Sequence, residues 1–307
     1  MALAMQGSGI AGVDWGAATV KLNEDGSVNL MVGATDIGQG SDTVLAQMCA
    51  QELGIAYEDV RVLSSDTDLT PFDVGAYASS TTYVSGGAVV KAARLVRDQL
   101  ALVAAKKWDC APEDVTFSNG TVGDGGARTL PMAELASFAL YHTKMQPMAT
   151  ASHMSNESPP PFAAQFADVE VDPETGEVFL RRFVSAVDCG TPIHPDLVEG
   201  QIEGAVAQAI GYGLFEEVII DRAGRVKNAN FLDYKIASAL DMPEMVTILV
   251  PTEEPSGPFG AKAAGEVPID GPAPAIVNAI CDAVGVRMYR IPATSERVWR
   301  QIKEAGE

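Results

Sequence analysis

The sequence has 307 residues, 47% of them hydrophobic, and a formal net charge of −20 at pH 7. Length and composition predict a globular protein of one large domain or two ordinary ones. The acidic surface argues against a nucleic-acid partner, and no apolar run reaches the roughly 18 residues that a membrane span needs. Four scattered cysteines without a Cys-x-x-Cys pair, and no secretory signal at the N-terminus, predict a reduced, cytoplasmic protein.

Hairpins and helices alternate along the chain. Hairpins are predicted where two strand-like runs flank a turn rich in Asn, Asp and Gly, at 18–33, 166–188 and 216–228. Helices are predicted by apolar residues at helical spacing, over 42–53, 84–106, 197–212 and 273–284. A polar, proline-rich stretch before Phe162 suggests a boundary between 1–158 and 159–307. The fold class is therefore α+β, with two mixed α/β subdomains.

Residues 33–43, GATDIGQGSDT, form the first candidate binding motif. Gly33, Gly38 and Gly40 separate a predicted strand from a predicted helix, where backbone N–H groups at the helix start can bind an anion. Glycine lets a ligand touch the backbone, and Gln39 adds an amide that can donate and accept. The alternative is a tight turn with Ser41 as the helix N-cap.

Three further stretches have the same character. Residues 79–82, four hydroxyl side chains, precede a long helix and suggest a phosphate cradle, although one capping serine would explain part of the pattern. Residues 257–265 supply glycines before Glu266, which is either a positioned base or a solvated loop residue. On the helix over 197–212, Gln201, Gly204 and Gln208 form a polar stripe that suits a flat polar ligand or a solvated face.

Together these stretches resemble a known family. The order and spacing of GATDIGQG, AYASSTT, DCG…HP…EGQIEGA and GAKAAGE are similar to the second molybdenum domain of the xanthine dehydrogenase and aldehyde oxidase family, the molybdenum hydroxylases. The resemblance covers about residues 17–303 and implies the molybdopterin-binding fold of that family. It implies molybdopterin with molybdenum, in the cytosine dinucleotide form. The pterin dithiolene holds the metal, so no side chain needs to bind it.

The resemblance also implies roles for residues at matching positions. Glu266 corresponds to the active-site base, and Tyr77 and Ala78 correspond to the substrate pocket. Many relatives have a small residue where this chain has Tyr77, which leaves the substrate open. The implied cofactor-binding residues are Gly38, Gln39, Gly40, Ser79, Ser80, Thr81, Gln201, Lys262, Ala263 and Gly265.

The implied activity is hydroxylation of a carbon of a small aromatic or heteroaromatic substrate with oxygen from water, two electrons leaving to iron–sulfur centres. This sequence shows no [2Fe–2S] motif, flavin domain or first molybdenum domain with its Gly-Gly-Phe-Gly type loop. We therefore expect a heteromeric complex with a larger molybdopterin-binding subunit, an iron–sulfur subunit and a flavin (FAD) subunit, as in the nicotinate dehydrogenase branch.

Other interpretations remain open. Purines, pyridine carboxylates, aromatic thioesters and aldehydes are all substrates of the family. Phe72, Tyr77 and Tyr83 suggest a flat aromatic ring, although such residues are as often part of a core. The chain is alternatively a non-catalytic scaffold that closes the cofactor cleft, or a nucleotide-binding module with similar glycine loops.

Overall fold

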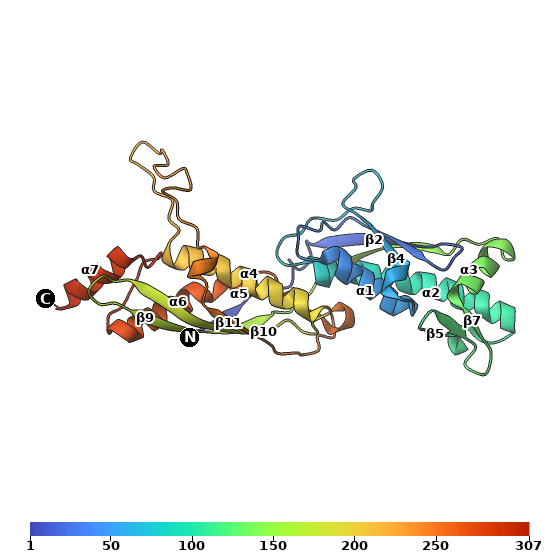
Figure 1. Cartoon of the computed structure of the whole chain (residues 1–307). Helices are drawn as coiled ribbons and strands as arrows, with labels where there is room; N and C mark the ends of the chain where they lie inside the picture. The colour runs from blue at the N-terminus through green and yellow to red at the C-terminus, as the bar shows by residue number, and fades with distance from the viewer. Residues whose placement is uncertain (307) are drawn as a thin grey trace. The chain divides into compact units, whose positions relative to one another are not determined.

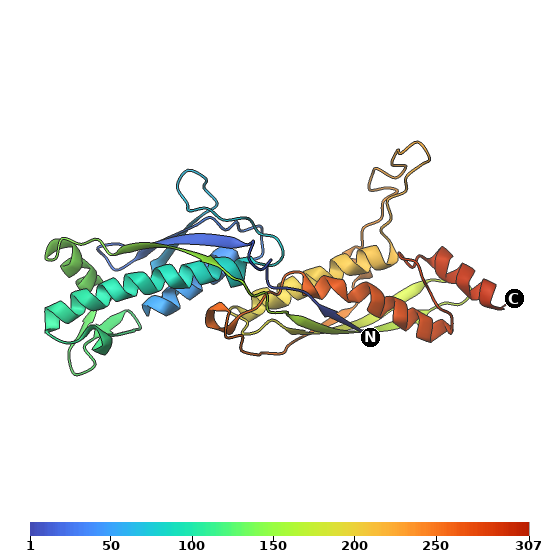
Figure 2. The ribbon, with the colours of Figure 1, turned by 180° about the vertical axis from the view of Figure 1, so that it is seen from behind.

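The computed structural model describes residues 1–306, which form two compact units (Figures 1 and 2). Unit 1 comprises residues 1–6, 160–252 and 264–307, and unit 2 comprises residues 7–159 and 253–263. The predicted halves, 1–158 and 159–307, differ from these units chiefly in two segments: the first six residues join unit 1, and residues 253–263 join unit 2. A boundary read from composition could not reveal this exchange, because it depends on contacts between distant parts of the chain.

Unit 2 is built on a four-stranded sheet in the order β4-β3-β2-β8. Its strands are β2 (Trp15–Leu22), β3 (Val28–Val32), β4 (Val60–Ser64) and β8 (Met148–Met154). The hairpin predicted over 18–33 is confirmed, since β2 and β3 pair antiparallel around its turn. The strands bury a continuous apolar face because Val20, Leu22 and Leu30 point into the core.

Two helices cover this sheet, and both were predicted. α2 (Gly86–Trp108) packs on β2 and β8, and α1 (Ser41–Leu53) packs on α2 and β4. The buried stripe of α2, which includes Val89, Val96 and Leu100, is the one that its periodicity indicates. The remaining elements are η1 (Tyr57–Asp59), η2 (Thr81–Ser85), η3 (Pro112–Asp114), β5 (Thr116–Ser118), β6 (Thr121–Gly123), β7 (Thr129–Pro131), α3 (Met132–Tyr141) and η5 (Pro258–Gly260).

Unit 1 has a four-stranded sheet in the order β1-β9-β10-β11. Its strands are β1 (Ala2–Met5), β9 (Phe162–Val171), β10 (Val178–Asp188) and β11 (Glu244–Leu249). The hairpin predicted over 166–188 is confirmed by the antiparallel pairing of β9 and β10. β10 and β11 pair parallel, which requires a crossover, and α4 (Pro195–Leu214) lies in that connection.

The helices of unit 1 form the other half of its core. α6 (Pro272–Val284) packs on β9 and on α4, and both helices were predicted from their periodicity. Phe183, Ile202, Ile210 and Ile276 are fully buried between the helices and the sheet. The shorter elements are η4 (Ala239–Asp241), α5 (Val267–Asp270) and α7 (Ser295–Gly306). Among the described residues, no helix combines the length and the apolar composition that crossing a bilayer requires.

The third predicted hairpin, over 216–228, is present only in a minimal form, without two regular strands. The chain turns where expected, because the Gly224 N–H donates to the Asp221 carbonyl. An antiparallel bridge joins Ile220 and Val226, and the backbone N–H groups of Asp221 and Lys227 donate to the carbonyls of Arg225 and Ile219. Residues 216–243, called the arm below, project from the body of unit 1 between α4 and β11 (Figure 1). The alternating apolar residues have no sheet beside them, so the strand pattern is not stabilised.

Candidate functional site

The glycine-rich loop before α1 has an open backbone. Gly38 and Gly40 adopt left-handed φ angles of 101° and 82°, which favour glycine. A Cβ atom added at Gly38 would meet nothing within 4 Å, so a ligand has room to touch this backbone. The N-cap of α1 is Gly40, and no side chain caps it. Ser41 is therefore not the cap; it is the first helical residue, and its buried hydroxyl has no partner among the described residues.

The backbone N–H groups at the start of α1 donate hydrogen bonds to an acidic side chain of the same loop, Asp36. The Asp36 carboxylate accepts from the N–H of Gly38 at 2.8 Å and from that of Asp42 at 3.1 Å. Burial alone would raise the pKa of Asp36, but these bonds, with one from the Gly40 N–H, lower it below its ordinary value. The anion expected at this helix N-terminus is thus supplied by the chain itself.

The Gln39 side chain folds back on its own loop. Its Oε1 accepts from the Ile37 N–H at 2.7 Å, and its Nε2 donates to the Thr35 carbonyl at 3.0 Å. In this conformation the amide fixes the shape of the loop. The predicted contact of Gln39 with a cofactor stays a prediction, and it requires either the remaining lone pair and proton of the amide or an exchange of these bonds.

The hydroxyl-rich segment before α2 is strained. Ala78 and Ser79 have φ angles of 49° and 53°, in the left-handed region that non-glycine residues rarely adopt. Residues 81–85 then form a π-helical turn, η2, before the regular helix begins at Gly86. Left-handed non-glycine residues and π-turns are both concentrated at functional sites. Ser80 is buried beneath this turn, whereas Thr81 is half-buried.

Tyr77 is held at the surface of unit 2. Its ring is 41% exposed, and its hydroxyl donates to the buried Asp14 carboxylate at 2.7 Å, which raises the pKa of Tyr77. The other Asp14 oxygen accepts from the Ile10 N–H at 2.8 Å. By contrast, Tyr83 is a core residue, and Phe72 packs against Trp15 with ring centroids 4.8 Å apart and the ring planes tilted by 32°. Of the three aromatic residues predicted near a pocket, Tyr77 and Phe72 are therefore exposed, whereas Tyr83 is part of the core.

The loop over 257–263 meets α1 and α2. A Cβ atom at Gly86, the first residue of α2, would lie 2.8 Å from Met48 Sδ of α1 and 3.3 Å from Pro258 Cγ of the loop. A Cβ atom at Gly257 would overlap the Ala261 carbonyl oxygen, so the turn requires glycine there. Lys262 and Ala263, both predicted cofactor-binding residues, are buried in this loop.

Ser8 connects these segments, and sequence reasoning missed it. Its hydroxyl accepts from the Ala263 N–H at 2.9 Å and donates to the Pro159 carbonyl at 2.6 Å. The adjacent Gly9 N–H donates to the Ala78 carbonyl at 2.9 Å. The small residues of the GSGI stretch were the available signal, because they permit this close backbone approach. Unit 2 thus brings together the helix of the glycine loop, the hydroxyl-rich turn and the 257–263 loop.

Unit 1 carries the other predicted residues, Gln201, Gly265 and Glu266. Gln201 is half-buried on α4. A Cβ atom at Gly200 or Gly204, on the same exposed face, would meet nothing within 4 Å. Gln208 is exposed one turn further along. The polar stripe predicted on this helix is therefore an open surface bordered by glycines.

Glu266 stands at the N-cap position of the short helix α5 and is exposed. Its Oε2 atom accepts a hydrogen bond from Nε2 of Gln6, a residue that follows β1. The remaining amide oxygen of Gln6 is buried and has no partner among the described residues. Burial raises the pKa of Asp270, and the charge of Glu266 raises it further.

A buried amide secures the backbone behind Glu266. Gln165 is fully buried, and its Nε2 donates to the Pro268 carbonyl at 2.8 Å and to the Ser185 hydroxyl at 3.0 Å. These bonds fix α5 to the central hairpin of the sheet. Sequence reasoning missed both Gln6 and Gln165, because their partners lie 260 and 103 residues away along the chain.

The predicted residues fit a flat polar cofactor. Gly38, Gly200 and Gly204 leave backbone surface uncovered, while the buried Ser41 hydroxyl has no hydrogen-bond partner among the described residues. The site residues are divided between the two units, since the chain passes from unit 2 to unit 1 between Ala263 and Ala264.

Comparisons with known proteins identify the family of the chain. Residues 1–243 match the family described as molybdopterin cofactor-binding domain. The chain is 38% identical over 302 residues to the xanthine dehydrogenase molybdenum-binding subunit of Escherichia coli O157:H7, covering 96% of this chain and 40% of that protein. It is 34% identical to the 6-hydroxypseudooxynicotine dehydrogenase complex subunit gamma of Paenarthrobacter nicotinovorans, covering 91% of this chain and 36% of that protein.

A solved structure is similar over the same extent. The quinoline 2-oxidoreductase of Pseudomonas putida 86 matches with a TM-score of 0.93 and 31% identity, covering 99% of this chain and 42% of that chain. The chain thus spans about two fifths of the length of the proteins it resembles. These matches confirm the resemblance and the mixed fold: the chain belongs to the molybdopterin cofactor-binding domain family of the molybdenum hydroxylases.

Proposed function

We propose that this chain is part of the molybdopterin-binding portion of a molybdenum hydroxylase and carries its catalytic base, Glu266. The observation that supports this most strongly is the exposed Glu266 carboxylate, which accepts a hydrogen bond from the Gln6 amide. A scaffold would need the contacts of α1, α2 and the 257–263 loop around Gly86, but it would not need this positioned carboxylate.

The proposed reaction is hydroxylation of a carbon in a small aromatic or heteroaromatic substrate with oxygen from water. Bound molybdopterin would supply the two-electron oxidation that no side chain can perform. Glu266 would accept a proton at Oε1 or Oε2 from the attacking water-derived oxygen. Gln6 would hold the carboxylate in one orientation, and the exposed ring of Tyr77 would contact a flat substrate.

The cofactor contacts are proposed residue by residue. The backbone at Gly38 and Gly40, with Gln39, would lie along the pterin. Ser79, Ser80 and Thr81 would bind its phosphates, and Gln201 would bind the pterin through its side-chain amide. Lys262, Ala263 and Gly265 would border the cofactor from the loop that carries Glu266. Ala78 would line the substrate pocket beside Tyr77.

The proposed assembly completes the enzyme. The matched relatives are about two and a half times as long as this chain, and one is described as a subunit of a complex. We propose that the remaining molybdopterin-binding region, iron–sulfur centres and FAD lie outside these 307 residues, and that the cofactor is the cytosine dinucleotide form.

Replacement of Glu266 tests the proposal. Glu266→Gln keeps the shape of the side chain but cannot accept the proton, so turnover of the complete enzyme should fall by about 10²–10⁴-fold. Molybdenum per complex should stay unchanged, because the carboxylate is assigned to the reacting oxygen. Glu174→Gln, in the exposed turn between β9 and β10, is the matched control and should have normal turnover. Near-normal turnover of Glu266→Gln would refute the assigned base, and loss of molybdenum would indicate a structural role.

A further inference from the structure

The short helix that follows Glu266 cannot satisfy its own carbonyl groups. α5 (Val267–Asp270) has four residues, and the last carbonyl groups of any helix lack a donor within that helix. In a continuing helix the Pro268 carbonyl would accept from the backbone N–H of residue 272, but that residue is proline and has no N–H. The sequence therefore ends the helix here, and its carbonyl groups need donors from elsewhere in the fold.

Side chains of two other elements supply these donors. The hydroxyl of Tyr212, in the last turn of α4, donates to the Ile269 carbonyl at 2.6 Å. The Gln165 amide of β9 donates to the Pro268 carbonyl at 2.8 Å. A Cβ atom at Gly271 would overlap the Oε1 atom of Gln165, so the chain just after α5 also packs on this buried side chain. Two consecutive carbonyl groups behind Glu266 are thus bonded to side chains of α4 and β9.

The apolar side of α5 is anchored as well. Val267 is 1% exposed and belongs to the core cluster that includes Ile202 and Ile276. Pro268 is also buried, whereas the Glu266 side chain is exposed. α5 packs on α4, β1 and β9. Glu266 is therefore an exposed side chain on a backbone that is fixed on its inner side.

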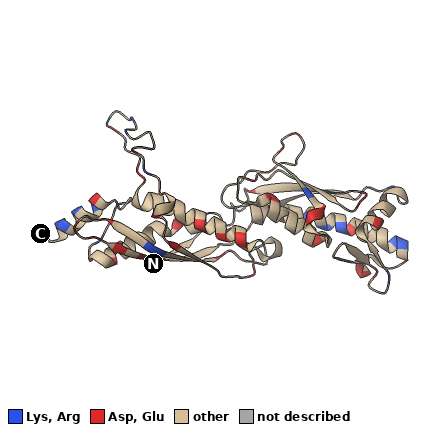
Figure 3. Ribbon diagram, viewed as in Figure 1, with Lys and Arg blue, Asp and Glu red and all other residues tan. Residues whose placement is uncertain are grey.

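The turn of α4 that carries Tyr212 is itself held in place. α4 has Asp and Glu but no Lys or Arg, so no basic residue of its own can brace it (Figure 3). Instead, the Gly213 carbonyl accepts from the Ala293 N–H at 2.7 Å. Burial, and next the charge of Asp270, raise the pKa of Tyr212, so its hydroxyl keeps the proton that it donates.

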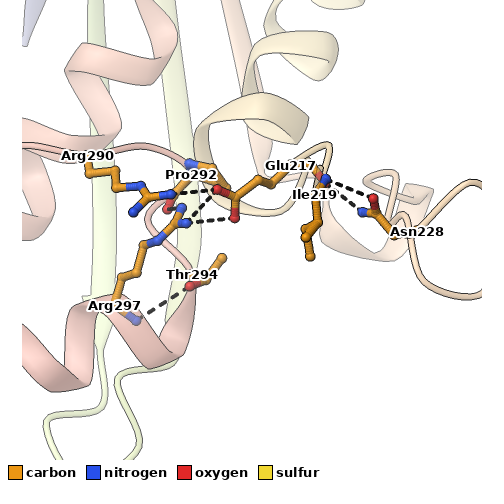
Figure 4. Close-up of polar contacts among 7 residues, drawn as sticks. All are labelled: Glu217, Ile219, Asn228, Arg290, Pro292, Thr294 and Arg297. Carbon is orange, nitrogen blue, oxygen red and sulfur yellow. Dashed lines mark hydrogen bonds and ion pairs between the residues drawn. The ribbon is translucent and has the colours of Figure 1, made fainter. Parts of the chain in front are cut away.

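A cluster of charges secures the chain just beyond α4 (Figure 4). The carboxylate of Glu217, at the root of the arm, accepts from Arg297 Nη2 at 2.6 and 2.7 Å and from Arg290 Nη2 at 3.0 Å. The hydrogen bond from Arg297, with the charges of both arginines, lowers the pKa of Glu217 below its ordinary value. Arg297 also donates to the Pro292 carbonyl at 2.9 Å. The end of α4 is thus tied to α7 and to the segment before it, which gives Tyr212 a fixed place from which to donate.

We propose that Tyr212 and Gln165 are positioning residues for the catalytic base, because they hold the carbonyl groups of α5 and so fix the backbone from which Glu266 projects. This inference rests on the proposed function. Gln6 bonds the carboxylate itself, whereas Tyr212 and Gln165 bond the backbone that carries it. Both kinds of support are needed, since proton transfer depends strongly on the distance and orientation of the base.

Tyr212→Phe tests the proposal in the complete enzyme, because it keeps the ring and removes only the hydroxyl. We expect kcat to fall about 3- to 10-fold, the factor that corresponds to the loss of one neutral hydrogen bond, while KM and molybdenum content stay unchanged. Tyr141→Phe is the matched control, since the Tyr141 hydroxyl also donates one hydrogen bond at 2.6 Å, to Glu24 in unit 2. The control should have the wild-type kcat. A wild-type kcat of Tyr212→Phe would overturn the inference.

The same substitution in the Glu266→Gln background separates positioning from general support. Without the base its position no longer matters, so Tyr212→Phe should leave the residual rate of metal reduction by substrate unchanged. A 3- to 10-fold fall in both backgrounds would overturn the inference, because Tyr212 would then act independently of Glu266. Gln165→Met should show the same dependence on Glu266, and if this buried variant does not assemble, Tyr212→Phe decides alone.

The two proposals fail in different ways. Normal turnover of Glu266→Gln, or a wild-type complex without molybdenum, would refute the proposed function and this inference with it. Loss of turnover in Glu266→Gln together with a wild-type kcat of Tyr212→Phe would refute the positioning role alone.

Discussion

The hydrogen bond from Gln6 to Glu266 makes the sharpest prediction, because the sequence alone does not suggest it. Gln6→Met removes the donor and nearly preserves the volume of the side chain. A hydrogen bond to a charged group contributes about 1.5–3 kcal/mol. If that energy holds Glu266 in its reactive orientation, the loss corresponds to a decrease in kcat of about 10- to 150-fold. KM should change little, since Gln6 contacts the base and is not assigned to the substrate.

The assay is steady-state turnover of the complete enzyme, with molybdenum content and thermal unfolding measured on the same preparation. Gln146→Met is the matched control, because Gln146 also donates one hydrogen bond, to the Leu22 carbonyl at 2.7 Å in unit 2. Both variants should lose similar stability, but the kcat decrease is expected for Gln6→Met alone. If both variants keep wild-type kcat, Gln6 does not position the base. If kcat falls together with molybdenum content, Gln6 supports the fold of the site and not the orientation of Glu266.

Three further predictions concern the units themselves. Burial, and next the charge of Lys91, lower the pKa of His153, so the stability that neutral His153 contributes is present above its ordinary pKa of 6.5 and is lost as the pH falls through the lower folded value. The Tm of His153→Asn should therefore decrease less between pH 7 and pH 5 than the Tm of the wild type. An equal decrease would contradict this. The Glu52 side chain is 7% exposed and pairs with Arg94 and Arg97, which are 61% and 42% exposed. The double variant Arg94→Met with Arg97→Met leaves a buried, unpaired carboxylate and should lower the free energy of unfolding by about 1–3 kcal/mol, more than Glu52→Gln, which leaves only hydrated arginines. Chemical denaturation gives the two free energies, and a larger loss for Glu52→Gln would refute the argument. Gly204→Ala should stabilise α4 by about 0.5–1 kcal/mol, because alanine favours a helix more than glycine does. The same variant should lower molybdenum occupancy, because the added Cβ atom enters the open space beside Gly204 that is proposed for the cofactor. A stabilised variant with full molybdenum occupancy would show that this face of α4 does not contact the cofactor.

Most regular elements could be predicted because their periodicity records burial. The stripe of Val89, Val96 and Leu100 and the alternation in β3 each correspond to one face packed on a core. The hairpin over 216–228 was predicted longer than it is. Its turn and one antiparallel bridge form, but no further strand lies beside Ile220 and Val226 to extend the pairing.

The site was predictable only in part, because a motif indicates chemistry but not conformation. The glycines of the first loop predicted backbone that a ligand could approach, and a Cβ atom at Gly38 would indeed meet nothing within 4 Å. The same motif gave no indication that Asp36 would take the helix donors or that Gln39 would bond to its own loop. Such choices depend on φ and ψ angles over a few residues, which propensities do not determine.

The residues that position Glu266 could not be predicted, because they lie far from it along the chain. The chain passes between its two units at Gln6–Gly7 and again at Ala263–Ala264. A hydrogen bond joins these two segments on each side of the passage, from Gln6 to Glu266 in unit 1 and from Ala263 to Ser8 in unit 2. Within unit 1 the Glu266 carboxylate is held by Gln6, 260 positions away in sequence, and the backbone of α5 behind it is held by Gln165, 103 positions from Pro268. A base on a loop without such bonds would lose orientation with each local fluctuation. The pairing therefore explains how an exposed carboxylate can keep the fixed geometry that proton transfer requires.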